Sequence, residues 1–375
     1  HIIGDLSERS ATLEFLIIRL KRKLKSSNVR FLFLSAVMPD LDGKEFSLWF
    51  SKNEENIIKS PIDIDGQEWQ PTRRLLGKFT WRGENGRIDY LKKDLLNLDD
   101  DKTNPPFVPN LISVKEYKDF TPKRRRERKV SFPNTDNKGH TAVELALKFS
   151  QDGHVLIFCS RPDWAISVGK AFLEMLRLKD INADDSYPNF FRPEENKLSF
   201  YIAKQWLGEN DTITQCLKRG IGIHFGKLAE AVRKAVEKDF RNKNIQVLIS
   251  TNTIAQGVNF PIKSVIVHSV VINPRENRKV SFRDFWNIIG RSGRAGKETE
   301  GQVIFIVKDE NDESLFNQYT NKENIEHAQS ILLILVYYLL HKRITIEDFH
   351  IYLEELIEPS LLNIALEETI DTKDQ

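Results

Sequence analysis

The sequence predicts an α/β protein with a parallel sheet, because short apolar runs alternate along the chain with segments of helical periodicity. Five runs are rich in β-branched or aromatic residues and have the length of strands that are covered on both faces. These runs are residues 29–34, 155–159, 245–249, 265–272 and 303–307. Helical periodicity occurs in residues 7–24, 141–149, 163–178, 228–240 and 282–289. Strands that alternate with helices in this way are typical of a parallel sheet with helices on its faces.

Two segments interrupt the alternation, and the end of the chain has a different character. Residues 83–137 contain an acidic run, a group of prolines and a basic run, which predicts a linker or an insertion. Residues 182–196 predict an irregular excursion from the later α/β region. After about residue 308 the strand-like runs stop, and helices are expected near residues 325–340 and 344–357.

Length and composition limit the class of protein. A chain of 375 residues allows two or three domains, and 40% hydrophobic with 29% charged residues is typical of folded globular proteins. The net charge of +2 gives little overall attraction to nucleic acid, so such binding needs local patches. Two cysteines, Cys159 and Cys216, are too few for a disulfide framework or a zinc site.

The most apolar run, residues 331–340, is about half of the roughly 20 residues needed to span a bilayer. The amino end also lacks a signal-peptide pattern. We therefore expect an intracellular, cytoplasmic protein that has no membrane partner, and we interpret this run as a buried helix.

The most informative stretch is NIIGRSGRAG, residues 287–296, in which Arg291 and Arg294 are three residues apart among small residues. On a helical turn this spacing points both guanidinium groups the same way. Two permanently charged forks suit a triphosphate whose transferred group gains charge in the transition state. The other interpretation, equally open on this stretch alone, is a solvated turn of glycine and arginine after a helix.

The order of the surrounding segments favours the first interpretation. Residues 250–261, STNTIAQGVNFP, follow a predicted strand and resemble motif V of superfamily 2 helicases, particularly of the superkiller-type DExH branch. Residues 287–296 resemble motif VI of the same family. Upstream, GIGIHFGKLAEAVRKAVEKDF at residues 220–240 is similar to that branch's segment of glycine, histidine and glycine before an arginine-bearing helix.

Three further segments extend the resemblance towards the amino end. HVLIFCSR at residues 154–161 resembles motif IV, and Ser35-Ala36-Val37 resembles motif III. HIIGD at residues 1–5 resembles the end of a DExH box whose acidic pair has been cut away. Six segments in family order cover most of residues 1–308, so the ordered set is far more specific than any one of them.

The resemblance implies a division of the chain into RecA-like helicase domains. Residues 1–80 would be the tail of the first RecA-like domain, and residues 81–137 a linker or insertion. Residues 138–308 would form the second RecA-like domain, on its own parallel sheet. Residues 309–375 would form a carboxyl-terminal helical extension.

The resemblance also implies a nucleotide site. Arg291 and Arg294 would be the arginine fingers that reach the γ-phosphate of ATP. Asn287 takes the place of the family's usual glutamine and has a shorter reach. His1 would be the last residue of the DExH box. The residues that would line the same cleft are Gly257, Asn259 and Gly290.

Motif III and the nucleic-acid track complete the implied site. Ser35 would couple hydrolysis to strand movement, because Val37 replaces the hydroxyl-bearing threonine of the family. The implied track makes sequence-independent contacts to phosphates through backbone amides, hydroxyls and one arginine at strand ends. Its residues would be Ser160, Arg161, His224, Gly226, Thr251 and Thr253. For His224 the alternative interpretation is a satisfied core histidine between Ile223 and Phe225.

Several other conspicuous residues have plainer interpretations. The basic run at residues 123–129 could follow a phosphate backbone, but such runs are more often solvated linkers. Trp164, Trp206 and Trp286 lie in helical patterns with apolar neighbours, which predicts core packing. Cys159 is predicted to be a small core residue.

In the intact protein we expect ATP-driven translocation along DNA or RNA, with unwinding and a single-stranded track. ATP and Mg²⁺ are the expected cofactors, held between two RecA-like domains, and no metal site is expected within this chain alone. One alternative is a non-catalytic RecA-like scaffold or regulatory module in a nucleic-acid-processing complex. Another is a helicase subunit of a nuclease, repair or phage-defence assembly. The helical extension is a possible surface for a protein partner.

The 375-residue chain is expected not to hydrolyse ATP by itself. It lacks the Gly-x-x-x-x-Gly-Lys-Ser/Thr loop that cradles phosphates, since none of its Gly-Lys pairs precedes Ser or Thr; those at residues 169–170 and 296–297, for example, precede Ala171 and Glu298. The acidic pair that would hold Mg²⁺ is also missing. A steady-state ATPase assay of the purified chain with saturating single-stranded nucleic acid measures this, and a stimulated rate clearly above the blank would contradict it.

Overall fold

The computed structural model divides the chain into two compact units, His1–Ile58 with Ile325–Gln375, and Lys59–Asn324. The residues that it describes are 8–24, 44, 46–48, 73–91, 106–119, 128–184, 186–195, 197–255, 262–290, 292–293, 300–321 and 324–325. In the first unit, helix α1 (Glu8–Lys23) confirms the helical pattern of residues 7–24. Its Glu14 and Ile17 are buried, whereas Leu16 and Leu20 are exposed.

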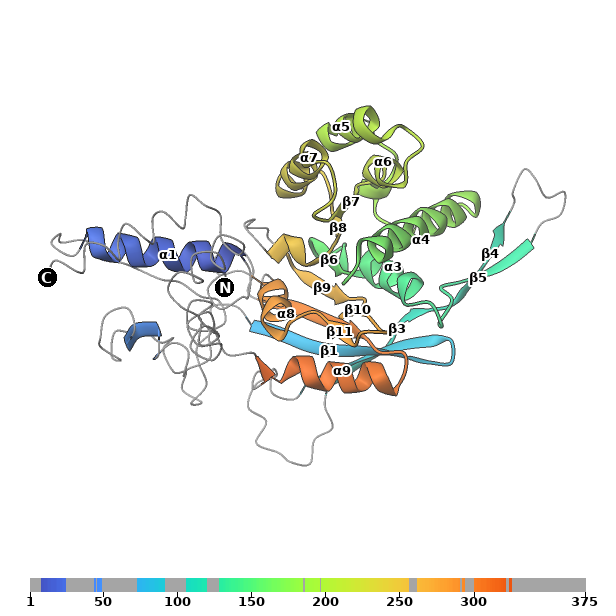
Figure 1. Cartoon of the computed structure of the whole chain (residues 1–375). Coiled ribbons are helices and arrows are strands. Elements are labelled where there is room, and N and C mark those ends of the chain that lie inside the picture. The colour runs from blue at the N-terminus through green and yellow to red at the C-terminus, as the bar shows by residue number, and fades with distance from the viewer. Residues whose placement is uncertain are drawn as a thin grey trace, which may run out of the picture. The chain divides into compact units, whose positions relative to one another are not determined.

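The larger unit is built on an eight-stranded sheet in the order β3-β2-β1-β12-β9-β6-β8-β7 (Figure 1). Six neighbouring strands, from β1 to β7 in this order, are parallel, and β2 and β3 continue the sheet as antiparallel strands. The strands of the sheet are β1 (Arg73–Arg82), β2 (Asn85–Tyr90), β3 (Phe107–Ser113), β6 (Val155–Phe158), β7 (Ile221–His224), β8 (Val247–Ser250), β9 (Ser264–Val267) and β12 (Glu300–Ile306). This mostly parallel sheet with helices confirms the predicted α/β class and is consistent with a RecA-like domain.

The middle of the sheet is apolar on both faces. Every residue of β6, β7, β8 and β9 is buried. Ile157 of β6 is in register with Ile249 of β8 and Ile266 of β9. Continuous apolar strands of this kind need cover on both sides, which the flanking helices supply.

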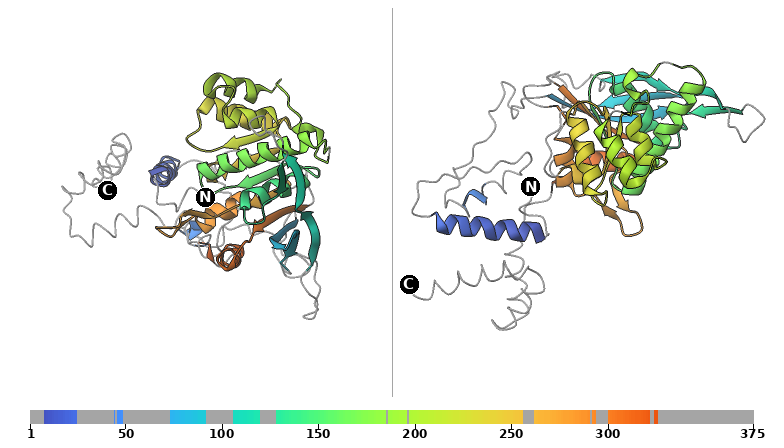
Figure 2. Two further views of the ribbon diagram at one scale, coloured as in Figure 1. Left: turned by 90° about the vertical axis from the view of Figure 1, so that its right-hand side faces the viewer. Right: turned by 90° about the horizontal axis from the view of Figure 1, so that it is seen from above.

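The helices lie on both faces because parallel strands are joined by right-handed crossovers. α3 (Lys138–Phe149) and α4 (Pro162–Ile181) pack together, and α4 contacts β7 and β8. The chain reverses direction along the sheet after β7, which places the later crossover helices on the opposite face. These helices are α7 (Glu230–Arg241) and α8 (Phe282–Ile289). Figure 2 shows the sheet between its helices from two sides.

Aromatic residues join the last strand of the sheet to the last described helix. Phe305 of β12 lies 6.3 Å from Phe285 of α8 and 5.9 Å from Phe316 of α9 (Glu310–Thr320), measured between ring centroids. Tyr319 of α9 lies 5.0 Å from Phe285, and its hydroxyl donates a hydrogen bond to the Val280 carbonyl. These contacts tie α9 to the larger unit.

The remaining elements lie around the edge of this core. α5 (Leu198–Leu207) packs against α6 (Thr212–Lys218) and against α7. Two short hairpins are separate from the main sheet, and one pairs β10 (Val271–Asn273) with β11 (Arg278–Lys279). The other pairs β4 (Lys115–Asp119) with β5 (Arg128–Phe132). Two 3-10 helices, η2 (Asn189–Phe191) and η3 (Asn252–Ala255), lie in the connections.

The β4–β5 hairpin is fastened to the carboxyl end of α4. The Asn182 side chain accepts from the Lys118 amide at 2.9 Å and donates to the Lys118 carbonyl at 2.8 Å, so it pairs with β4 as a neighbouring strand would. Lys179 of α4 donates to the Tyr117 hydroxyl at 3.3 Å and to Asp184 at 3.2 Å. Arg177 adds a 2.8 Å ion pair with Asp119.

The segment 83–137, predicted to be a linker or insertion, contributes β2 and β3 to the sheet and also forms this hairpin. Its strands escaped notice because they bury single side chains, such as Ile88 between polar neighbours, instead of forming continuous apolar runs. The predicted run 265–272 is divided between β9 and β10. β1 runs across residue 80, and the domain limits stay predictions.

Other expectations have mixed outcomes. Core packing is confirmed for Trp286 and Cys159, which are buried, but it is wrong for Trp206, which is 62% exposed on α5. Trp164 is half-buried. Several predicted segments lie outside the described residues: the strand 29–34, all but Ile325 of the helix near 325–340, the helix near 344–357, and residues 123–127 of the basic run. No helix among the residues that are described is long and apolar enough to cross a membrane.

Phe79→Ala is expected to lower the free energy of unfolding of the larger unit by about 3–5 kcal/mol. The Phe79 ring is fully buried and meets the Trp81 ring edge-on, with 5.2 Å between centroids. It also fills the space above Gly86, where an added Cβ atom would come within 2.2 Å of the ring.

Phe107→Ala is the matched control, because Phe107 is 47% exposed on β3 and its loss should cost less than about 1 kcal/mol. Urea unfolding followed by tryptophan fluorescence measures both variants. Equal losses would contradict the burial of the β1–β2 pair.

Candidate functional site

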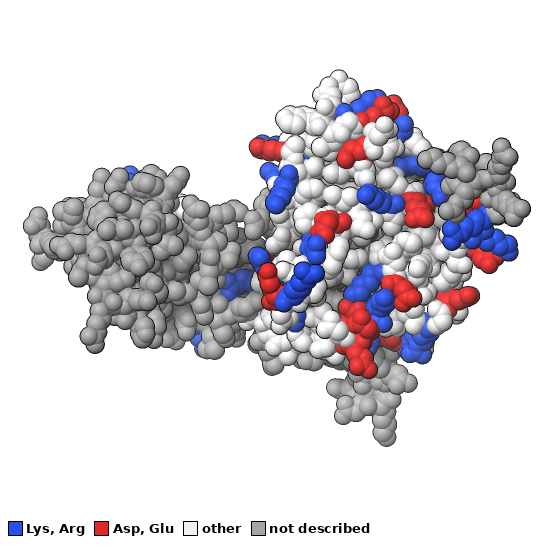
Figure 3. All heavy atoms as spheres, turned by 45° about the vertical axis from the view of Figure 1, so that its right-hand side comes forward, with Lys and Arg blue, Asp and Glu red and all other residues white. Residues whose placement is uncertain are grey.

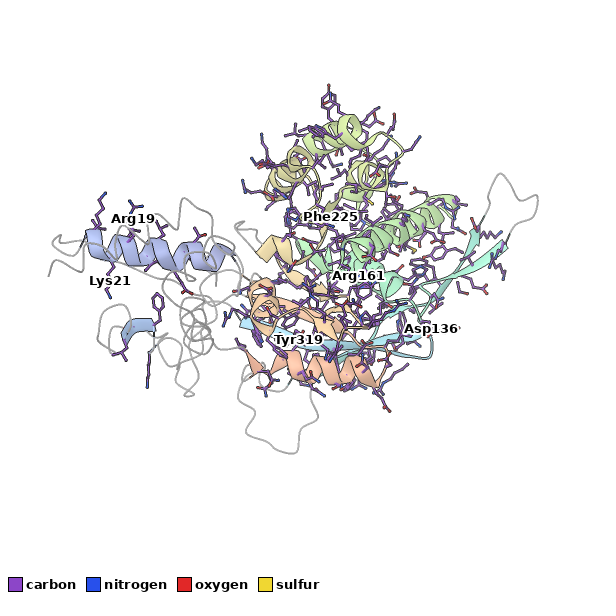
Figure 4. All side chains as sticks on the ribbon, in the orientation of Figure 1. Arg19, Lys21, Asp136, Arg161, Phe225 and Tyr319 are labelled. Carbon is purple, nitrogen blue, oxygen red and sulfur yellow. The ribbon has the colours of Figure 1, made fainter. Side chains whose placement is uncertain are left out.

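The predicted track residues that follow β6, β7 and β8 lie at one edge of the sheet. The three strands are neighbours and run parallel, so their carboxyl ends meet at the same edge. The connection after β6 leads towards β7, whereas the connection after β8 leads the other way to β9. Such a reversal opens a crevice at the carboxyl ends of strands, which is where α/β proteins usually bind ligands. Figure 4 labels Arg161 and Phe225, which follow β6 and β7.

Ser160 and Arg161 form the turn between β6 and α4. The Ser160 hydroxyl donates to the Val271 carbonyl at 2.5 Å. Arg161 is the N-cap residue of α4, and its guanidinium is held by Asp163, with 3.0 Å between Nε and Oδ1. The guanidinium carbon also lies 5.2 Å from the centroid of the Trp164 ring. Arg161 is therefore positioned at a helix amino terminus, where backbone amides and the guanidinium together favour an anion.

Thr251 and Thr253 follow β8, and they face the end of β7. The Thr251 amide donates to the His224 carbonyl at 3.2 Å, which extends the pairing of the two strands by one residue. The Thr251 and Thr253 hydroxyl oxygens are 3.3 Å apart. Thr253 Oγ1 also lies 3.4 Å from His224 Nδ1. The two threonines are thus one hydrogen-bonded group with His224.

Gly226 lies close to this group. A Cβ atom added at Gly226 would come within 3.1 Å of Thr253 Cγ2. Its carbonyl accepts from Arg233 of α7 at 3.0 Å. The backbone after β7 is therefore held from one side by Arg233 while it passes close to Thr253 on the other.

His224 is a buried and hydrogen-bonded histidine, as the core interpretation expects, and it also contacts the predicted track. Its side chain is 3% exposed, and Nε2 lies 2.8 Å from Glu237 Oε1. Burial lowers the pKa of His224 below its usual value, and the hydrogen bond to Glu237 opposes that shift. Sequence reasoning missed Glu237. Its only signal was an acidic residue near the apolar stripe of the helix that follows the histidine.

Asn287 and Gly290 lie near the end of α8, which packs against η3 and so brings the motif VI segment to the motif V segment. Ser281 caps the start of α8 by accepting from the Asp284 amide at 3.0 Å. Asn287 is buried, and its Nδ2 has no hydrogen-bond partner among the described residues. At the carboxyl end of α8, the Gly290 carbonyl accepts from Arg74 Nη2 of β1 at 3.4 Å. The carboxyl end of a helix favours a cation.

The turn after α8 is held between two other segments. The Gly293 amide donates to the Ile262 carbonyl at 2.9 Å, and Ser292 forms a parallel bridge with Ile262. Gly293 has φ of +66°, a conformation that favours glycine. Gly301 of β12 passes so close that an added Cβ atom would lie 2.4 Å from the Gly293 nitrogen. The backbone of Ser292 and Gly293 is thus closely confined.

The structure leaves part of the predicted site untested. His1, Ser35, Gly257, Asn259, Arg291 and Arg294 lie outside the described residues. Among the residues that are described, no group of three or more His, Cys, Asp and Glu side chains is arranged to hold a metal ion. On the face drawn in Figure 3, Lys and Arg are interspersed with Asp and Glu. Because the net charge is only +2, attraction of an anion must come from local groups such as those at the strand ends.

Residues 193–296 match the family model of the helicase conserved C-terminal domain. The ATP-dependent DNA helicase Hel308 of Methanococcus vannielii is 26% identical over 318 residues, which cover 83% of this chain and 34% of that protein. The exosome RNA helicase MTR4 of Homo sapiens is 24% identical over 309 residues, which cover 82% of this chain and 27% of that protein. Residues 193–296 of this chain thus carry a helicase C-terminal domain.

The region that matches the family model begins before α5 and ends after α8, so it includes the hydrogen-bonded group of Thr251, Thr253 and His224. A wider likeness extends over the chain. The Hachiman protein HamB of Bacillus cereus is 31% identical over 370 residues, which cover 96% of this chain and 30% of that protein. The chain thus spans about a third of the length of these relatives.

Gly301→Ala is expected to lower the free energy of unfolding of the larger unit by about 1–3 kcal/mol, because its new Cβ atom meets backbone atoms that cannot rotate away. Gly139→Ala in α3 is the control, since its Cβ atom would meet nothing closer than 3.1 Å and alanine favours a helix. Urea unfolding compares the two variants. A Gly301→Ala domain as stable as the control would show that the turn at residues 292–293 is not confined.

Proposed function

We propose that the chain supplies one side of the ATP site and half of the nucleic-acid track of an ATP-dependent helicase or translocase. The observation that carries the proposal is the meeting of six predicted track residues at one edge of a parallel sheet. The second support is the packing of α8 against η3, which joins the two motifs that the family uses at its nucleotide. The family model and the helicase relatives favour the same activity for the intact protein.

The track would bind nucleic acid through its phosphate groups. Arg161 offers a guanidinium at the amino terminus of α4, and Thr251 and Thr253 offer hydroxyls beside it along the strand edge. Gly226 and its neighbours offer backbone amides. Groups of this kind bind a single strand of DNA or RNA without reading its sequence, which a translocating motor needs.

The nucleotide side of the proposal rests on the end of α8. Arg291 and Arg294 would hold the γ-phosphate. Gly257, Asn259 and Gly290 would line the same cleft. His1 and Ser35 would belong to the first RecA-like domain, in its DExH box and its motif III. A buried amide nitrogen with no described partner, Asn287 Nδ2, suits a site that a polar ligand or a second domain completes. Mg-ATP, when bound, supplies the phosphoryl group that passes to water. Mg²⁺ itself would be held by carboxylates on the preceding RecA-like domain.

The proposal includes a finer assignment to one branch of the helicases, and it has one competing candidate. The motif order favours the superkiller-type DExH branch, and the likeness to MTR4 fits that branch. The likeness to HamB extends over nearly the whole chain, well beyond the helicase model. A second candidate is a non-catalytic module of a repair or defence complex, which would never turn over ATP. ATPase activity of the intact protein separates the two candidates.

In the full-length protein, Arg294→Ala is expected to lower kcat for ATP hydrolysis by about 10³-fold, or roughly 4 kcal/mol of barrier, with little change in nucleic-acid affinity. A guanidinium acts mainly on charge that develops in the transition state. Arg294→Lys should rescue poorly, because lysine keeps the charge but loses the fork. Steady-state ATPase assays with saturating nucleic acid measure these variants and Arg291→Ala.

A thermal melt of each variant is the control for folding. If the arginines were a solvated turn, each substitution would change the barrier by only about 0–1 kcal/mol. Full activity in both alanine variants would refute the assignment. A lost melting transition would mean that the arginines hold the fold instead.

A further inference from the structure

Behind the two threonines lies a chain of hydrogen bonds that the proposed function does not use. His224 Nε2 lies 2.8 Å from Glu237 Oε1 on α7. On the other side of the ring, Nδ1 lies 3.4 Å from Thr253 Oγ1, which in turn lies 3.3 Å from Thr251 Oγ1. These hydrogen bonds therefore connect a carboxylate on one side of His224 with the hydroxyls at the strand edge on the other.

The chemistry of the groups gives this chain a direction. A carboxylate only accepts hydrogen bonds, so Nε2 of the neutral ring carries the proton and Nδ1 is an acceptor. Two hydroxyls face Nδ1. The Ser250 hydroxyl lies 3.5 Å away and donates to the Thr251 carbonyl at 3.0 Å, so its proton is engaged elsewhere. The Thr253 hydroxyl is left as the donor to Nδ1, and its proton points inward.

We propose that Glu237 and His224 are positioning residues, which turn the Thr253 hydroxyl towards a phosphate group of nucleic acid by taking up one proton at His224. The inference rests on the proposed function, because it needs a phosphate at this edge of the sheet.

The proton balance follows from the same donor and acceptor rules. A phosphate oxygen accepts hydrogen bonds, so it requires the Thr253 proton to turn outward. That turn alone would leave the buried Nδ1 unpaired, which is unfavourable. A proton taken from solvent onto Nδ1 satisfies both groups, because the imidazolium donates to Thr253 Oγ1 while Thr253 donates to the phosphate. Glu237 accepts from Nε2–H throughout and balances the new positive charge.

The surroundings of His224 suit such an exchange. Burial holds the pKa of His224 below its usual value, Glu237 raises it and Arg233 lowers it. Arg233 lies on the same helix as Glu237 and donates to the Gly226 carbonyl. From β8 and the residues after it, the described groups that face the ring are the neutral hydroxyls of Ser250 and Thr253. The ring is therefore neutral near pH 7 until a phosphate, whose negative charge raises its pKa, is bound.

The first test measures the affinity of the 375-residue chain for fluorescein-labelled 12-nucleotide oligothymidine and oligouridine, by anisotropy at constant ionic strength between pH 8 and pH 5.5. Uptake of one proton limits the gain in affinity to about 10-fold per pH unit, and we expect about 5-fold between pH 8 and pH 6. His154 and His268 do not interfere, because burial lowers the pKa of each to about 4.

Glu237→Gln is the decisive variant. Its amide oxygen still accepts from His224 Nε2–H, so the affinity at pH 8 should stay within about 2-fold of the wild type. The gain at low pH should disappear, because no carboxylate stabilises the imidazolium. Glu230→Gln is the matched control on the same helix, where Glu230 is exposed and pairs with Lys234 at 2.6 Å. Both variants remove one negative charge, but only the control should keep the wild-type pH profile.

A second measurement is made on the wild-type chain. Nitrogen NMR of the ¹⁵N-histidine-labelled wild-type chain should show His224 as the Nε2–H tautomer when free and as imidazolium when saturated with oligonucleotide at pH 6.5. Its signals are assigned by their loss in His224→Gln. An Nδ1–H tautomer, a ring that stays neutral on saturation, or the same pH profile in Glu237→Gln as in the wild type would overturn the inference. A wild-type chain that binds neither oligonucleotide at any pH would overturn the proposed function together with it.

Discussion

The burial of β6 between β8 and β9 is the constraint on which the rest of the structure depends. All residues of these three strands are buried, so their backbone groups must pair with one another along the whole length of each strand. Parallel pairing then brings the three carboxyl ends to one edge, and the chain must turn there each time. The turns after β6 and β8 carry the track residues, and β7 brings His224 beside them.

The sequence predicted continuous apolar runs and clear helical stripes, and it missed strands that are very short or that bury single side chains. Residues 155–158 and 282–289 were expected almost residue for residue, because a continuous apolar run and a clear helical stripe leave few alternatives. β7 has only four residues, one of them Gly222, and β2 buries Ile88 between polar neighbours. Such strands become recognisable only when their partners in the sheet are known, since the burial comes from pairing and not from local pattern.

The same distinction applies to the site. Ser160, Thr251 and Thr253 could be named from motif order, because each follows a predicted strand directly. Glu237 could not be named, since its role depends on which face of α7 meets the end of β7, a contact between residues thirteen positions apart. Trp206 shows the opposite error. An aromatic residue in a helical pattern with apolar neighbours predicts core packing. In the structure, α5 packs against α6 and α7 with its apolar stripe, and Trp206 lies on its exposed face.

The hydrogen bond between Arg74 and the Gly290 carbonyl gives the domain a mechanical linkage. β1 pairs with β12 over seven residues, from Arg73 opposite Glu300 to Phe79 opposite Ile306. Tension applied along the chain ahead of β1 acts lengthwise on this ladder, so it loads all of its hydrogen bonds in shear at once, and none of them opens alone. Arg74 lies at the end of the ladder where this tension is applied, and its side chain also donates a hydrogen bond to the Gly290 carbonyl at the end of α8. A force on the amino end of β1 is therefore transmitted to the end of α8 through this hydrogen bond and not through the hydrophobic core.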